Sequence, residues 1–98
     1  MKAVFIAYNQ ALTEAVNSIL DRHQIRGYSK WADVQGRGTN GGEPHFGNHT
    51  WPAMNSVVLA ITEDEQVEPL LASLKKLNSK AEQQGLRAFV WNVAEQQV

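Results

Sequence analysis

The chain has 98 residues, of which 43% are hydrophobic and 19% are charged, with a formal net charge of −1. This length suits one domain with a small core, so association with other copies would add buried surface. Nine Lys and Arg against ten Asp and Glu argue against nucleic-acid binding. The absence of cysteine excludes disulfides, thiolate metal sites and a cysteine nucleophile. The first apolar run is too short for a signal peptide or membrane span, so we expect a soluble cytoplasmic domain.

Hydrophobic patterning predicts six secondary-structure elements. Strands are expected where β-branched and aromatic residues concentrate, at residues 2–8, 28–35, 54–62 and 86–93. Helices are expected where apolar residues recur every three or four positions, at about residues 10–24 and between the acidic stretch 62–65 and Gly85. In chain order this is β-α-β-β-α-β.

The second helix carries its own start signals. Thr62 to Glu65 has the spacing of a capping box, and its acidic side chains suit a helix N-terminus. We expect Pro69 in the first turn of this helix, because the missing N–H costs no hydrogen bond there.

The element order predicts an α+β fold, a ferredoxin-like βαββαβ sandwich with a four-stranded antiparallel sheet. We expect residues 1–93 to form this single domain and residues 94–98 a polar tail. Two helices cover only one face of such a sheet, yet three of the strands are apolar on both faces. The uncovered face predicts a homo-oligomer.

The connection between the second and third strands, residues 36–53, is the unusual segment of the chain. It contains five of the seven glycines and two of the three histidines. Loops longer than about 12–15 residues are uncommon in compact domains, and they are usually functional or disordered. We expect the chemistry of the protein to lie in this loop.

The exit from the second strand has the sequence Asp-Val-Gln-Gly-Arg-Gly, residues 33–38. It resembles the strand that leads into the mobile T-loop of the PII signalling family, and the element order matches as well. The resemblance implies a PII-like trimer whose sheets face inward, with a regulatory rather than a catalytic role. CutA-type proteins share this fold and trimer and are the nearest structural alternative.

Two features depart from PII proteins proper. The family's Gly-Asp-Gly-Lys-Ile phosphate loop is replaced by Ala-Glu-Gln-Gln-Gly-Leu-Arg at residues 81–87, and the loop 36–53 has no tyrosine. The run at residues 42–56 is more similar to a divergent PII-like group encoded beside heavy-metal efflux pumps of the resistance-nodulation-division class. That similarity implies a membrane transporter as partner.

One carboxylate and two imidazoles in the loop form a candidate metal site: Glu43, His45 and His49. These donors suit Zn²⁺, Cu²⁺, Co²⁺ or Ni²⁺. In a Gly/Pro-rich loop the spacing permits a site without requiring one. The alternative is that the histidines are solvated, pack on Trp51 or form hydrogen bonds across subunits.

A candidate anion site is formed by Gly36, Arg37, Gly38 and Arg87. Glycine lets backbone N–H groups approach a phosphate or carboxylate closely, and the guanidinium groups add positive charge. The alternative is a bulge that leaves Arg37 in solvent. Nothing in the sequence holds a nucleophile and a base in fixed geometry, so we do not expect an enzyme.

These observations support three hypotheses in order. The first is a trimeric PII-like regulator that senses a small ligand, with a divalent transition metal as first choice, and whose loop acts on a transporter. The second is an adenine-nucleotide sensor that uses Arg37 and Arg87. The third is a structural or interaction trimer without a ligand.

Overall fold

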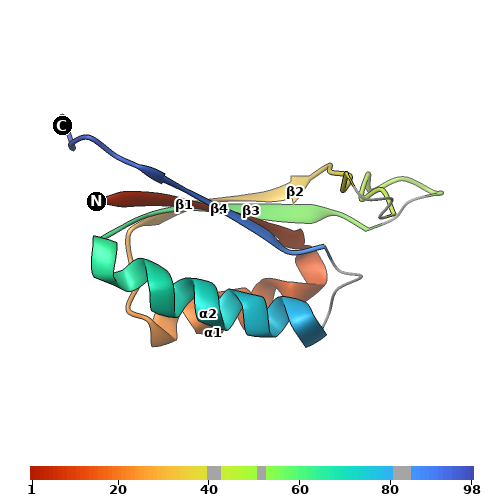
Figure 1. Ribbon diagram of the computed structural model, residues 1–98. Helices are drawn as coiled ribbons and strands as arrows, with labels where there is room; N and C mark the ends of the chain where they lie inside the picture. The colour runs from red at the N-terminus through yellow and green to blue at the C-terminus, as the bar shows by residue number, and fades with distance from the viewer. Residues whose placement is uncertain (40–42, 51–52, 81–84) are drawn as a thin grey trace.

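The computed structural model describes residues 1–39, 43–50, 53–80 and 85–98 (Figure 1). The elements are β1 (Lys2–Asn9), the 3-10 helix η1 (Gln10–Leu12), α1 (Thr13–Arg22), β2 (Tyr28–Val34), β3 (Asn55–Thr62), α2 (Asp64–Lys80) and β4 (Arg87–Asn92). The strands form one antiparallel sheet in the order β2-β3-β1-β4. The predicted ferredoxin-like α+β architecture is confirmed.

Both helices lie on one side of the sheet, so the molecule has two layers (Figure 1). The core between the layers consists of alternate strand residues and the inner stripes of the helices. Val4, Ile6 and Tyr8 of β1 are fully buried there, as are Leu70 and Leu74 of α2. The two helices of the same chain therefore cover this face of the sheet.

The opposite face of the sheet is apolar and exposed. Its large side chains are Trp31, Ile61, Phe89 and Trp91, which keep 45% to 58% of their surface exposed. The rings of Phe5 and Phe89 lie side by side there, with centroids 6.4 Å apart. The predicted apolar character of both strand faces is therefore confirmed.

The first helix begins later than expected. The side chain of Asn9 accepts a hydrogen bond of 2.9 Å from the Ala11 N–H, which starts η1 rather than an α-helix. The α-helical hydrogen-bond pattern begins only at Thr13 and ends at Arg22. Asn9 is thus the cap of the segment, as its short polar side chain favours.

The second helix begins with a different cap from the predicted one. Gln66 reaches back to accept a 2.9 Å hydrogen bond from the Glu63 N–H, so the box is built on Glu63 and not on Thr62. Because the helix starts at Asp64, Pro69 lies inside it rather than in its first turn. The prediction for Pro69 was wrong. A backbone N–H at position 69 would have donated to the carbonyl of Glu65. Because Glu65 is exposed, water can donate a hydrogen bond to that carbonyl instead.

No helix in the described ranges is long and apolar enough to cross a lipid bilayer. After β4, the Val93 N–H donates a 3.1 Å hydrogen bond to the Met1 carbonyl, and residues 94–98 form no helix or strand.

Candidate functional site

The end of β2 is bent before the long loop begins. The pairing of β2 with β3 shifts register between Trp31 and Val34, and Asp33 has a φ of +58°. Aspartate tolerates this left-handed conformation better than most residues, and the Gln10 side-chain amide donates a 2.5 Å hydrogen bond to its carboxylate. The bulge fixes the direction in which the chain leaves the sheet.

Two residues after the strand ends, the chain pairs with the returning side of the loop. Gly36 and His45 exchange two backbone hydrogen bonds, of 2.9 Å and 2.7 Å, in an antiparallel bridge. A Cβ atom at position 36 would collide with the side-chain amide of Asn55. Glycine is therefore required at Gly36 by this close contact.

The returning side of the loop is also anchored. The Gly47 N–H donates to the Ala53 carbonyl at 3.0 Å, and the Gln10 N–H donates to the Met54 carbonyl at 2.9 Å. Gly47 has a φ of +66° and faces the Met54 side chain, which leaves no space for a Cβ atom. The described part of the loop is thus hydrogen-bonded to the domain.

His45 lies at the centre of the loop base. It is buried, and its Nδ1 lies 2.6 Å from Oδ1 of Asn55 at the start of β3. Since an amide oxygen only accepts, this contact requires a proton on Nδ1 of His45. The Cβ position of Gly85 lies 3.9 Å from Cε1 of His45, so the segment that enters β4 passes beside the ring.

Arg87 begins β4 at this same end of the sheet, paired in register with Ala7. Its Nη1 donates a 2.8 Å hydrogen bond to the Leu86 carbonyl, which holds the guanidinium near the surface. Neither Arg87 nor Arg37 forms a salt bridge within the described ranges, and both are exposed. The predicted position of Arg87 at the head of the strand is confirmed.

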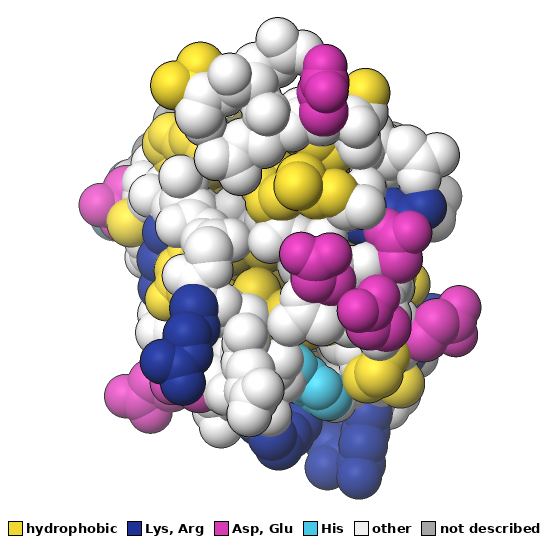
Figure 2. Space-filling model, turned by 90° about the vertical axis from the view of Figure 1, so that its left-hand side faces the viewer, with side chains coloured by type: hydrophobic (Ala, Val, Ile, Leu, Met, Phe, Trp, Pro, Cys, Tyr) yellow, Lys and Arg dark blue, Asp and Glu magenta, His cyan; other side chains and the backbone are white. Residues whose placement is uncertain are grey.

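The opposite end of the molecule carries charges of both signs. Figure 2 looks onto the end that carries both termini, where acidic side chains lie together with Lys and Arg side chains. Asp64 and Glu65 open α2 at this end, and the N-terminal ammonium donates a 2.7 Å hydrogen bond to the Asp64 carboxylate. That ammonium lowers the pKa of Asp64. Exposed arginines without a salt bridge in the described ranges therefore lie at both ends of the sheet, Arg37 and Arg87 at the loop base and Arg26 at the other end.

The structure brings the predicted anion-binding segments together around His45. Gly36 pairs with His45, and Gly85 lies beside the His45 ring. Arg37, Gly38 and Arg87, which follow these two glycines in the sequence, are exposed. Sequence reasoning missed Asn55. The sequence feature that could have identified it is a polar residue at the start of an otherwise apolar strand.

The predicted metal ligands are not brought together. No group of three His, Asp or Glu side chains in the described ranges could hold a metal ion. Glu43 and His49 are exposed, whereas His45 is buried with Nδ1 engaged by Asn55. The side-chain contact links His45 to the sheet instead, and Trp51, the expected packing partner, lies outside the described residues.

The fold and its anchored loop define a PII-like signalling domain. The chain belongs to the nitrogen regulatory protein P-II family, whose sequence model matches residues 1–98. A comparison with curated protein sequences found no relative.

Solved structures of similar fold share little sequence with this chain. CPII from Thiomonas intermedia K12, a nitrogen regulatory PII-like protein bound to ADP, AMP and bicarbonate, is 22% identical, with a TM-score of 0.76 over 94% of this chain and 84% of that chain. Its apo form is 21% identical, with a TM-score of 0.71 over 94% and 87%. A candidate PII-like signalling protein from Thermus thermophilus is 22% identical, with a TM-score of 0.68 over 94% and 85%.

Proposed function

We propose that this protein is a PII-like regulator that senses an adenine nucleotide at the base of the loop 36–53. The observation that supports this most directly is that His45 pairs with Gly36 through backbone hydrogen bonds and also lies beside Gly85, two residues before Arg87. The similar protein CPII has been solved with ADP and AMP bound. An adenine nucleotide, which was the second hypothesis from the sequence, is therefore the first choice of ligand in this proposal.

The chemistry of the loop base suits phosphate groups. Arg37 and Arg87 are exposed and form no salt bridge in the described part of the chain, so their guanidinium groups are available for bidentate contacts with phosphate oxygens. The backbone at Gly38 has open space around it, which allows an anion to approach its N–H closely. In the proposal these contacts replace the Gly-Asp-Gly-Lys-Ile loop that the sequence lacks.

A bound nucleotide would act as a switch through this geometry. A ligand that contacts both the Gly36 turn and Arg87 fixes the start of the loop relative to β4. Ordering a loop costs conformational entropy, and the ligand contacts offset that cost. One loop conformation is then presented to a partner, and its loss on nucleotide release ends the interaction.

The assembly in this proposal is a trimer that regulates rather than catalyses. The exposed aromatic face of the sheet supplies the contact surface between copies. The partner in the proposal is a membrane transporter of the heavy-metal efflux class, as the resemblance of residues 42–56 suggests. Co-purification of that transporter with the protein, in the presence and absence of ADP, tests this part separately.

A transition metal becomes the second choice of ligand. Its three proposed donors, Glu43, His45 and His49, do not form a cluster in the described ranges, and binding at His45 would have to proceed through Nε2 or break the Asn55 contact. Calorimetric titration with Zn²⁺, Cu²⁺, Co²⁺ and Ni²⁺ gives this alternative its own test.

The nucleotide proposal is tested by calorimetry on nucleotide-free protein with ADP, AMP and ATP. We expect saturable binding, weakened about tenfold to a hundredfold in Arg87→Ala and in Arg37→Ala, because each loses a charge-assisted contact. Arg26→Ala is the matched control, since Arg26 is an exposed arginine in the turn before β2, at the other end of the sheet. Absence of saturable binding, or an equal loss in Arg26→Ala, would contradict the proposal.

A further inference from the structure

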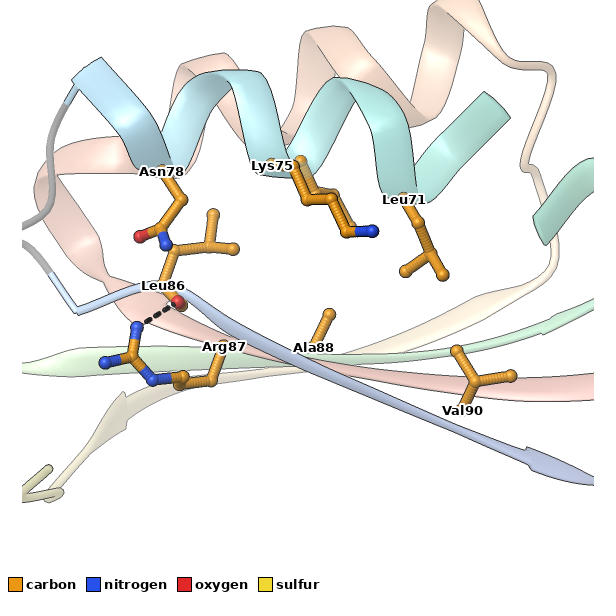
Figure 3. Close-up of a pocket in the computed structure, with 8 residues that line it drawn as sticks. Leu71, Lys75, Asn78, Leu86, Arg87, Ala88 and Val90 are labelled. Atoms are coloured by element: carbon orange, nitrogen blue, oxygen red, sulfur yellow. Dashed lines mark hydrogen bonds between the residues drawn. The ribbon is translucent and has the colours of Figure 1, made fainter. Parts of the chain in front are cut away.

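A groove of about 390 Å³ runs between α2 and the edge strand β4, on the helical side of the sheet (Figure 3). One wall is a single face of α2 that carries Leu71, Lys75 and Asn78, at the three- and four-residue spacing that aligns side chains on a helix. The other wall is β4, where Ala88 and Val90 point into the groove (Figure 3). This groove is not part of the loop-base site, although Arg87 lies at the boundary of both.

Asn78 gives the groove an unusual polar feature. Its Oδ1 is buried and has no hydrogen-bond partner among the described residues. Figure 3 shows the side chain directed from α2 toward Leu86, at the end of the groove nearest the start of β4. Buried polar atoms in folded proteins are nearly always paired, so this acceptor indicates a missing N–H or O–H donor.

Lys75 provides a positive charge one helical turn from Asn78. Its side chain lines the groove and extends along it toward Leu71, with the ammonium above the apolar wall (Figure 3). Lys75 forms no salt bridge within the ranges that the structure describes. An ammonium beside an apolar surface is a suitable partner for a small carboxylate.

The remaining surface of the groove is aliphatic. Leu71 and Val90 lie at the end of the groove away from Asn78, and Ala88 lines the β4 wall between Arg87 and Val90 (Figure 3). Small side chains and branched aliphatic groups form a surface that suits a short apolar body. The groove thus sets three requirements for a ligand: a hydrogen-bond donor, a carboxylate and an aliphatic chain.

We propose that the α2–β4 groove binds an aliphatic α-amino or α-hydroxy acid. The α-ammonium or α-hydroxyl donates to Oδ1 of Asn78, the carboxylate pairs with Lys75, and the side chain packs on Leu71 and Val90. The two acid classes share this donor–carboxylate–aliphatic chemistry, and the experiment distinguishes them. The proposal does not depend on nucleotide binding, because neither Lys75 nor Asn78 belongs to the loop-base site.

Calorimetry with four matched compounds tests the chemistry. L-leucine and L-2-hydroxy-4-methylpentanoate have all three features, 4-methyl-2-oxopentanoate lacks the donor, and 3-methylbutylamine lacks the carboxylate. We expect at least one of the two complete acids to bind. The one that binds more tightly shows whether the groove prefers an α-amino or an α-hydroxy acid. The compounds lacking the donor or the carboxylate are expected to bind at least about tenfold more weakly, since each loses one polar contact.

Two variants and a control place the binding in this groove. Lys75→Met and Asn78→Ala are expected to weaken binding about tenfold or more. Lys76→Met removes the neighbouring lysine, which lines the groove between the two helices instead, and is expected to leave binding unchanged. ADP binding, measured on the same samples, is expected to persist in all three variants, so that failure here and failure of the nucleotide proposal are separable.

Three results would overturn the proposal. The first is no saturable binding of either complete acid up to about 10 mM, a concentration that detects even very weak complexes. The second is an equal loss in Lys76→Met and Lys75→Met. The third is equal affinity for the oxo acid and for the tighter of the two complete acids, which would remove Asn78 from the contact.

Discussion

The two faces of the sheet are built from the same strands but have opposite environments. On the helical side, Val4 and Ile6 of β1 are fully buried, with Val58 of β3 beside them. On the other side, Phe89 and Trp91 of β4 keep 58% and 48% of their surface exposed. Alternation along each strand sends neighbouring residues to these two faces, so the difference lies in what covers them rather than in composition.

This difference separates what one chain stabilises from what an assembly would stabilise. The covered face has the packing that holds the domain together, and its residues carry most of the folding free energy. The open face has aromatic side chains in a contiguous patch, which monomeric proteins rarely leave in water. Substitutions on the two faces should therefore change different measurements.

The largest effect is expected from the covered face. Leu70→Ala removes a fully buried side chain of α2 and leaves a cavity against the core, which we expect to lower the free energy of unfolding by about 3–5 kcal/mol. Chemical denaturation gives this value. Glu68→Ala, an exposed position on the same helix, is the control and should change stability by less than about 0.5 kcal/mol. A small loss in Leu70→Ala would mean that the helix is not held by this packing.

A different measurement responds to the open face. We expect the double variant Phe89→Ser and Trp91→Ser to keep the fold, because both side chains are exposed in the single chain. The wild-type protein is expected to scatter light as a trimer, three times the 10.9 kDa of one chain, and the variant as a monomer.

Lys30→Ser, on the helical side of β2 near the sheet edge, is the control for that variant and should leave the assembly unchanged. A wild-type protein that scatters as a monomer at micromolar concentration would contradict the proposed role of the open face.

A smaller effect is expected at Tyr8, whose ring is in the core. Its hydroxyl is buried and forms no hydrogen bond of ordinary geometry among the described residues, although the side chains of Thr13 and Ser56 lie close enough to act on its pKa. Tyr8→Phe should therefore leave the unfolding free energy at pH 7 unchanged or raise it by up to about 1 kcal/mol. Denaturation curves of the two proteins measure the difference, and a loss above about 1 kcal/mol would indicate a hydrogen bond in solution.

Tyr8 also predicts a pH dependence. Burial is the largest cause that raises the pKa of the Tyr8 phenol above 10.0. The unfolded phenol ionises at the lower pH, so this contribution to stability is complete below pH 10 and is lost as the pH rises through the folded pKa. Tyr8→Phe should remove that alkaline loss. An unchanged slope above this pH would assign it to other groups.

The sequence predicted the architecture because each face of each element has its own periodic signal. The alternation through β1 and the three-four stripe of α1 specify both type and orientation, and the six elements were found in order. The open sheet face followed from the same alternation. The errors at Thr62 and Pro69 concern the position of a helix start, which depends on a side chain, Gln66, that selects the N–H group of the cap.

The candidate site was only partly predictable. Gly36 and Arg87 were predicted as candidate anion-binding residues from their types. The anchoring of Gly36 depends on His45 and Asn55, which are ten residues apart in sequence and meet across the loop base. His45 looks like a metal ligand in the sequence because nothing local reveals its hydrogen bond. The groove beside α2 was missed for a similar reason, since Lys75 and Asn78 have the pattern of an ordinary solvent-facing helix surface.

The bridge between Gly36 and His45 has a consequence for how the loop can change during evolution or engineering. Its two backbone hydrogen bonds close the connection at its base, so a new recognition tip can be placed between these two residues, beyond Arg37 and Gly38, without changing the sheet. Closure entropy rises slowly with length, by about 0.6 kcal/mol for each doubling of the loop. Foreign sequences of different lengths can therefore be inserted between Gly36 and His45 with little cost to the sheet, which makes the bridge a natural grafting point.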